Sequence, residues 1–114
     1  MPHSPNGWLQ RILLWLFVAV ARPEHLFVFA YDVEKDSARG KIADALGESL
    51  DRVQLSVFEG RLTSAAAEQL SRRAAALMGP DDSLRVYCVT EAGRRGSFVF
   101  GAPPLAERHD FFLL

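Results

Sequence analysis

Cysteine is almost absent from this sequence of 114 residues, since Cys88 is the only one. A single thiol excludes an internal disulfide framework and a zinc site built from several cysteines. Because Cys88 lies in the apolar run Leu84–Val89, we expect a buried and unreactive thiol. A chain of this length fits one domain and can fold around its own core without a disulfide or a structural metal.

The sequence also lacks a large excess of either charge, with 13 basic and 14 acidic residues and a formal net charge of −1. The overall charge therefore does not by itself indicate a nucleic-acid partner. Eleven of the basic residues are arginine, whose planar guanidinium suits phosphate recognition better than the lysine ammonium does. The three histidines have no neighbours at ligand spacing, so we expect them at the surface.

Long apolar runs are missing, and the longest near the N-terminus, Ile12–Ala21, is too short to span a bilayer. Three interpretations stay open for this segment. It resembles a signal peptide, with Ala19–Ala21 as a cleavage site; it indicates a start codon assigned too early; or it is a genuine helical extension that covers a partner or a dimer. We treat residues 1–25 as an extension of unknown role, and we expect a cytoplasmic protein that makes no membrane contacts.

The remaining sequence alternates strand and helix patterns. Short apolar runs predict strands, and apolar residues at helical spacing predict two helices, the first capped by Asp36 or Ser37 and the second by Thr63 or Ser64. The predicted strands are Leu26–Tyr31, Arg52–Leu62 (split by a bend or bulge near Ser56–Phe58), Ser83–Thr90 and, after a turn at Ala92–Gly96, Ser97–Phe100.

This order predicts an α+β protein with a ferredoxin-like βαββαβ fold and an appended C-terminal strand. Right-handed crossovers then give an antiparallel sheet with both helices on one face. A second copy is the simplest cover for the other face, so we expect a homodimer. The predicted domain spans residues 26–101, and residues 102–114 form a tail for dimer or partner docking.

Asp32 is the strongest candidate for chemistry because it ends a predicted buried strand, where the sheet opens to a ligand. One carboxylate holds Mg²⁺ poorly, since the ion prefers six oxygen ligands. Two Asp32 side chains facing across a two-fold axis would make a better site for a shared Mg²⁺, which could activate water or bridge phosphate oxygens. The alternative is an aspartate that only caps a helix or stabilises a turn.

Five basic residues could line a nucleic-acid backbone. Arg39 and Lys41 fall in the first turns of the first helix, Arg52 opens the next strand, and Arg94 and Arg95 lie in the predicted turn. The alternative is that these are solvated charges with no ligand.

The segment Arg95–Phe100 is weakly similar to the signature of RNA-recognition motifs, in which strand aromatics stack on bases. Its spacing is short and its position in the fold differs. A core or interface role for Phe98 and Phe100 is therefore favoured, and an RNA-binding module stays as an alternative.

Several motifs together resemble one family. They are Phe29–Val33, Arg39-x-Lys41-Ile42, Arg52–Gly60 (RVQLSVFEG) and a following helix opened by Leu62-Thr63. This combination is similar to the small CRISPR-associated endonuclease and spacer-acquisition family, the "second" Cas protein. The resemblance covers residues 26–89 and says nothing about residues 1–25.

The resemblance implies a ferredoxin-like homodimer in which the last strands of each chain pair with the partner's sheet. It also implies a complex with the family's integrase, in which the dimer bridges two integrase dimers and measures a double-stranded DNA spacer. For some members it implies metal-dependent cleavage of RNA or DNA. Matched by motif, the metal-binding catalytic residue is Asp32, and the rest of the site is Tyr31, Arg39, Arg52 and Phe58. Lys41 stands where many members have arginine, and Leu55 stands where an aromatic residue is common.

Two main functions follow from these observations. The first is an adaptor that bridges integrase dimers on DNA and docks through its apolar end, Phe111, Phe112, Leu113 and Leu114. The second is a free-standing, Mg²⁺-dependent endoribonuclease of the toxin type.

Overall fold

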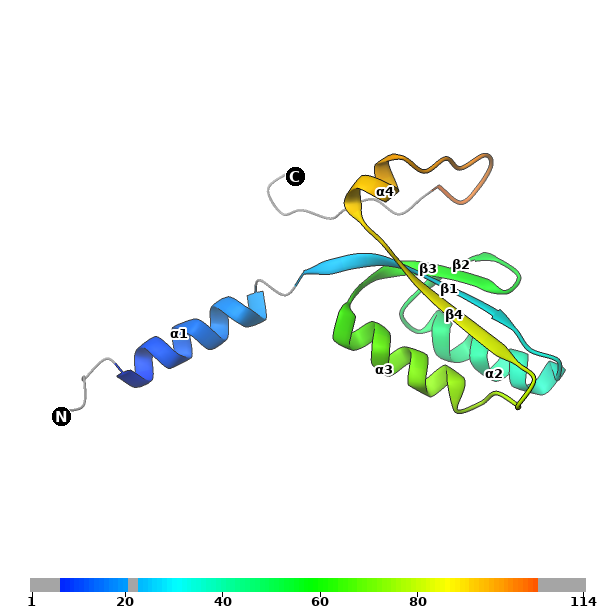
Figure 1. Ribbon diagram of the computed structural model, residues 1–114, viewed down its shortest axis with the longest axis horizontal. Coiled ribbons are helices and arrows are strands. Elements are labelled where there is room, and N and C mark those ends of the chain that lie inside the picture. Colours follow the sequence, from blue (N-terminus) through cyan, green and yellow to red (C-terminus); the bar gives the residue numbers. More distant parts are fainter. Residues whose placement is uncertain (1–6, 21–22, 105–114) are drawn as a thin grey trace.

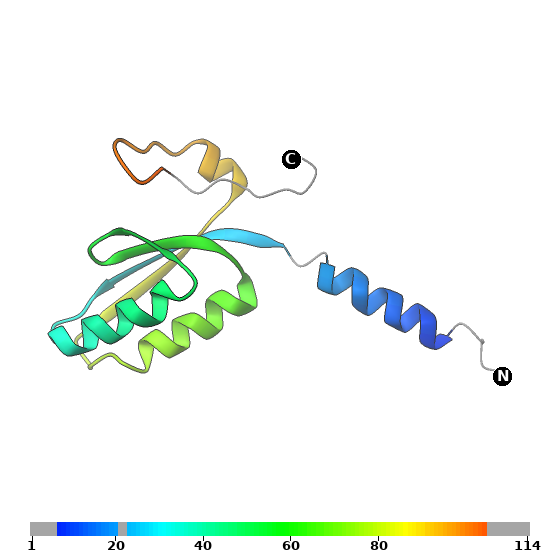
Figure 2. The ribbon, with the colours of Figure 1, turned by 180° about the vertical axis from the view of Figure 1, so that it is seen from behind.

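The computed structural model describes residues 7–20 and 23–104, with side chains described for 7–13 and 23–104. A four-stranded antiparallel sheet has the order β2-β3-β1-β4, and two helices, α2 and α3, pack on one face of it (Figures 1 and 2). The predicted βαββαβ order and antiparallel sheet are confirmed. The elements are β1 (Glu24–Asp32), α2 (Asp36–Gly47), β2 (Asp51–Gln54), β3 (Val57–Thr63), α3 (Ser64–Ala75) and β4 (Ser83–Val89).

The core lies between the sheet and these two helices. Alternate residues of β1 point toward the helices, and Phe27, Phe29 and Tyr31 are all buried there. Ile42 and Leu46 of α2 meet them and are fully buried. Each such side chain contributes about 1.5–3 kcal/mol through removal from water, so the central strand and α2 supply much of the stability.

The two helices begin in different ways. Thr63 caps α3 as predicted, since its hydroxyl accepts a hydrogen bond of 3.1 Å from the amide of Ala66. The prediction of Asp36 or Ser37 as the cap of α2 is wrong, because α2 begins after Lys35 without any side-chain cap. The guanidinium of Arg39 fastens this end of α2 instead, and its contacts are described with the site below.

The predicted split of Arg52–Leu62 into two strands is confirmed, and the bend expected near Ser56–Phe58 is a hairpin turn. Leu55 and Ser56 join β2 to β3, and the register between the strands is irregular between Arg52 and Gln54. The turn projects beside α2, which makes it part of the site described below.

The prediction of a strand at Ser97–Phe100 is wrong for the single chain, because this segment has no regular structure and pairs with none of the strands in the described residues. The predicted turn before it is a short helix, α4 (Glu91–Arg95). Thr90 caps this helix by accepting from the amide of Gly93 at 3.0 Å, and Glu91 pairs with Arg94 at 2.9 Å. These local interactions stabilise a helical turn, whereas a strand would need a neighbouring edge to pair with.

Cys88 is exposed, so the prediction of a buried thiol is wrong. Among the strands that the structure describes, its strand β4 is an edge of the sheet and pairs with β1 alone. An apolar run on an edge strand is covered less completely than one in the centre, which the sequence pattern does not reveal.

The N-terminal helix α1 (Gly7–Val20) extends away from the sheet and from the other helices (Figures 1 and 2). Trp8 and Leu13 are more than half exposed. Within the described residues, no helix combines the length and apolar character needed to cross a bilayer. Residues 7–20 are thus helical, and the three interpretations of this segment stay open. The predicted docking residues Phe111, Phe112, Leu113 and Leu114 lie outside the described residues.

Candidate nucleic-acid interface

The last two residues of β1 project to opposite faces of the sheet. Tyr31 points toward the helices and is only 6% exposed. Asp32 follows it, is exposed, and lies on the helix-free face opposite Ser83 of β4. Two residues that the sequence grouped in one site are therefore separated by the thickness of the sheet.

The helix-free face also carries Glu59 and Asp51, which lie opposite each other on β3 and β2. Both line a hollow of about 320 Å³ together with Pro103 and Pro104, where the chain returns across the edge of the sheet. Burial in this hollow raises the pKa of the Glu59 carboxyl above its usual range.

No group of three or more histidine, cysteine, aspartate or glutamate side chains able to hold a metal ion is found in the part of the chain that the structure describes. Asp32 thus offers one carboxylate at its end of β1. Within residues 7–20 and 23–104, Asp32 alone is not a complete Mg²⁺ site, because one carboxylate leaves most of the ion's coordination to water.

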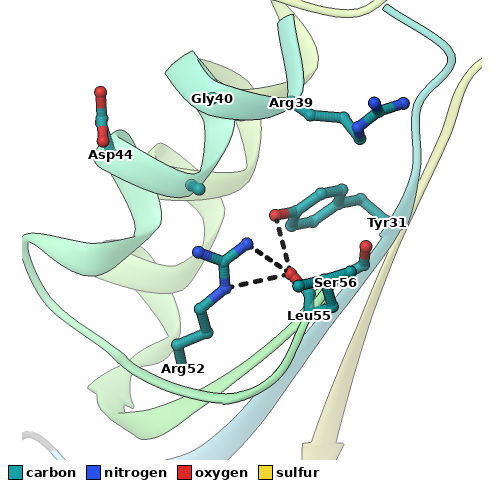
Figure 3. A pocket seen from close by; sticks show the side chains of 8 residues that line it. Tyr31, Arg39, Gly40, Asp44, Arg52, Leu55 and Ser56 are labelled. Carbon is teal, nitrogen blue, oxygen red and sulfur yellow. Dashed lines mark hydrogen bonds between the residues drawn. The ribbon is translucent and has the colours of Figure 1, made fainter. Parts of the chain in front are cut away.

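The other face of the sheet carries a cavity of about 310 Å³ between α2 and the β2–β3 hairpin, which we call the α2 cavity (Figure 3). Two of its walls come from consecutive elements of the chain, α2 and the β2–β3 hairpin. The residues that line it are Tyr31, Arg39, Gly40, Ala43, Asp44, Arg52, Leu55 and Ser56.

The carbonyl oxygen of Leu55 is the centre of a hydrogen-bond network in this cavity. Arg52 donates to it twice, from Nε at 3.0 Å and from a terminal nitrogen at 2.6 Å, and the hydroxyl of Tyr31 lies 3.5 Å away (Figure 3). The amide of Tyr31 also donates to the carbonyl of Ser56 at 3.1 Å. Side chain and backbone together hold the hairpin turn against the end of β1.

Phe58 lies behind this network. The Tyr31 ring stacks on the Phe58 ring with centroids 6.3 Å apart, and the guanidinium carbon of Arg52 lies 5.4 Å from the Phe58 centroid. Phe58 is 2% exposed. The structure therefore brings together Tyr31, Arg52 and Phe58, three of the five predicted catalytic residues, on the side of the sheet away from Asp32.

Arg39 lines the same cavity, but its guanidinium is hydrogen bonded to the loop after β1. One terminal nitrogen donates to the carbonyls of Val33 at 2.8 Å and Glu34 at 2.7 Å, and the other pairs with Asp36. Figure 3 shows the guanidinium of Arg39 directed away from Arg52. Its main role in the single chain is to fix the start of α2.

The other predicted phosphate contacts lie elsewhere. Lys41 is exposed on α2 and does not line the α2 cavity. Arg94 and Arg95 belong to α4, which lies across the sheet from α2 (Figures 1 and 2). Arg94 hydrogen bonds to Glu91 and lowers the pKa of that carboxyl. The five predicted cations thus form two groups, one on each side of the sheet.

Phe98 and Phe100 are 84% and 94% exposed, so a core position is wrong for both in the single chain. The interface and RNA-stacking roles stay predictions for these side chains.

Sequence reasoning missed several members of the site. Gly40, Ala43, Asp44 and Ser56 were not predicted as site residues, because their place in the cavity depends on the approach of α2 to the hairpin. Asp82 was also missed: its carboxylate accepts from the amides of Gly79 at 2.7 Å and Glu34 at 3.0 Å, and these bonds lower its pKa. It joins the loop before α2 to the loop before β4.

Comparisons with known proteins agree on one family. A family model described as CRISPR associated protein Cas2 matches residues 25–95. A protein named CRISPR-associated endonuclease Cas2 2, from Thermus thermophilus, is 40% identical over 92 residues, which are 80% of this chain and 98% of that protein. One named CRISPR-associated endoribonuclease Cas2 2, from Synechocystis sp., is 37% identical over 90 residues, 77% of this chain and 97% of that protein.

Solved structures share the fold. The crystal structure of a hypothetical protein from Thermus thermophilus has 41% sequence identity and a TM-score of 0.64, covering 75% of this chain and 100% of that one. The structure of Streptococcus pyogenes Cas2 has 24% identity and a TM-score of 0.58, covering 67% of this chain and 99% of that one, and supports the fold alone. The family model begins at residue 25, so α1 lies outside the matched region.

Proposed function

Because this chain belongs to the CRISPR-associated Cas2 family, we propose that it acts in CRISPR adaptation as a symmetric dimer that binds a nucleic-acid backbone and cleaves phosphodiester bonds. The observation that carries the proposal is the position of Asp32. Its carboxylate is exposed on the helix-free face at the end of β1. The residues directly before and after it in the sequence, Tyr31 and Val33, are buried. A rigid strand end presenting one exposed carboxylate suits a site completed by a second copy.

In the proposed dimer the helix-free faces of two sheets lie together and bring two Asp32 carboxylates to the two-fold axis. Two carboxylates fit Mg²⁺, which is bound in phosphoryl-transfer sites by one or two carboxylates together with substrate phosphates. When bound, the ion supplies activation of water and charge neutralisation at the phosphate. The chain's own contribution is to orient the two carboxylates through the fixed ends of β1.

The names of the relatives support the nuclease part of the proposal, since the Thermus protein is called an endonuclease and the Synechocystis protein an endoribonuclease. The basic side chains support the binding part. Lys41 is exposed on α2, on the side of the sheet that the proposed dimer leaves uncovered, so two copies would present two separated phosphate contacts. We propose the family's integrase as the protein partner, docked by the tail after Pro103.

Asp32→Ala tests the catalytic part. We expect Mg²⁺-dependent cleavage of labelled RNA and DNA to be lost in this variant, while Asp81→Ala, which removes an exposed carboxylate from the turn before β4, keeps it. Equal activity in both variants would contradict a catalytic role for Asp32. If Asp32→Ala abolishes cleavage but still supports spacer acquisition in cells, the adaptor function is the biological one.

A further inference from the structure

We infer that the α2 cavity binds one unstacked nucleobase of a nucleic-acid strand. This inference rests on the proposed function and names a substrate feature that the backbone contacts alone do not provide. It follows from the charge balance of the cavity, from its shape and from an unexplained glycine in its wall.

The cavity is not built for phosphate, although two arginines line it. Two nitrogens of Arg52 already donate to the Leu55 carbonyl, and both terminal nitrogens of Arg39 are engaged with the loop after β1. Asp44 also lines the cavity on the α2 side, with its exposed side chain directed away from Arg52 in Figure 3, and its negative charge at the rim would weaken the binding of an anion. A neutral ligand with hydrogen-bond donors fits this arrangement better than an anion.

The shape favours a flat ligand. Arg52 lies over the Phe58 ring and lines the cavity, whereas Phe58 does not, so the guanidinium separates the ring from the open space. A guanidinium held in place by its hydrogen bonds is a stacking platform of the kind that proteins offer to unpaired bases. Leu55, in the hairpin turn, is 81% exposed and also lines the cavity, so its apolar side chain is available to contact a bound base. A cavity of about 310 Å³ is at the small end of ligand sites, which suits one base or nucleoside.

Gly40 is the residue that the fold does not explain. It lies inside α2, where glycine destabilises a helix by about 1 kcal/mol relative to alanine. Its φ is not positive, and a Cβ at this position would meet no atom within 4 Å, so neither conformation nor packing requires glycine. Gly40 does line the α2 cavity, and the lack of a side chain keeps that wall open to a ligand.

Asp44 sets the base preference. A carboxylate accepts hydrogen bonds from amino and imino groups, and guanine presents two adjacent donors of this kind on its Watson–Crick edge. Thymine and uracil have a single imino donor there, flanked by carbonyl oxygens that a carboxylate repels. We therefore expect guanine to bind most tightly and thymine and uracil to bind most weakly.

The test measures binding of fluorescein-labelled oligothymidylates to the full chain. The three probes carry a central dG, a central dT or a central abasic site, and a blunt duplex of the same length reports backbone binding alone. We expect the dG probe to bind roughly tenfold more tightly than the abasic probe, as is typical for one stacked base. Gly40→Leu should abolish this difference while leaving duplex affinity unchanged, and Asp44→Asn should reduce the preference for dG over dT.

Gly47→Ala is the matched control, because it also removes a glycine from α2 but lies outside the cavity. It should raise thermal stability, as Gly40→Leu should, without altering the preference for dG. Equal affinity of the wild-type chain for the dG and abasic probes, with duplex binding intact, would overturn the nucleobase site and leave the proposed function standing. Retention of the dG preference in Gly40→Leu would overturn it as well. Failure to bind any of the four probes would overturn both.

Discussion

Arg52 binds the carbonyl of Leu55, three residues further along the chain, through two hydrogen bonds of 3.0 and 2.6 Å. The same guanidinium lies over Phe58, so one side chain contacts both the turn and the start of β3. This relationship makes Arg52 a structural residue in the single chain. Two of its three guanidinium nitrogens donate to the Leu55 carbonyl in the absence of a ligand.

Replacing Arg52 should therefore weaken the fold. Arg52→Ala loses the charged hydrogen bonds and the contact with Phe58, and we expect the free energy of unfolding to fall by about 1–2 kcal/mol. Chemical denaturation measures this loss. Arg85→Ala is the control, since Arg85 is an exposed arginine on β4 with one long bond of 3.4 Å to Tyr87. Similar losses in the two variants would contradict the role of Arg52 in the hairpin.

The cap of α3 should be equally measurable. Thr63→Ala removes the acceptor for the amide of Ala66, and we expect a loss of about 1 kcal/mol in unfolding free energy. Ser64→Ala, one residue later, should change stability little. The prediction fails if Ser64→Ala is as destabilising as Thr63→Ala.

Asp82 should make stability depend on acid pH. Its backbone hydrogen bonds with Gly79 and Glu34 lower the pKa of the carboxyl in the folded state. The unfolded chain then binds the proton more readily, so the stabilisation is present above about pH 4 and is lost as the pH falls through the lowered pKa. Asp82→Asn should be less stable than the wild type at pH 7, with a difference that shrinks on acidification. Asp81→Asn should show no such convergence, and a constant difference for Asp82→Asn would contradict the assignment.

Glu59 should have the opposite effect. Burial raises the pKa of its carboxyl, so the folded state binds the proton more tightly than the unfolded state does. The associated stabilisation is present at low pH and is lost as the pH rises through the raised pKa. Glu59→Gln should therefore gain stability relative to the wild type between about pH 4 and pH 7. Thermal unfolding at several pH values checks this, and a gain that does not change with pH would argue against burial as the cause.

The central fold could be predicted from the sequence because its signals are local and agree with one another. The apolar β1 run, the helical spacing of Ile42 and Leu46, and the Thr63 cap each specify an element without reference to distant residues. The strand predicted at Ser97–Phe100 failed because strand formation depends on an available edge, which the residues themselves do not encode.

The candidate site was only partly predictable, for a related reason. Motif resemblance identified Tyr31, Arg52 and Phe58, which do lie together. It also grouped them with Asp32, although alternation along a strand sends Tyr31 and Asp32 to opposite faces. Gly40 and Asp44 could not be assigned to a cavity before the hairpin was placed against α2, because helical and strand patterns do not specify how two consecutive elements pack together.

The measurement that tests the central claim most directly is crosslinking at position 32. The variant D32C, made in a Cys88→Ser background so that no other thiol is present, places one reactive group at the end of β1 in each chain. If two Asp32 positions meet across a two-fold axis, mild oxidation or a short bis-maleimide should convert the protein to a covalent dimer rapidly and at low protein concentration. D81C in the same background should crosslink slowly and only at high concentration. Equal crosslinking of the two variants would show that the ends of β1 do not face each other, and the shared carboxylate site would have to be abandoned.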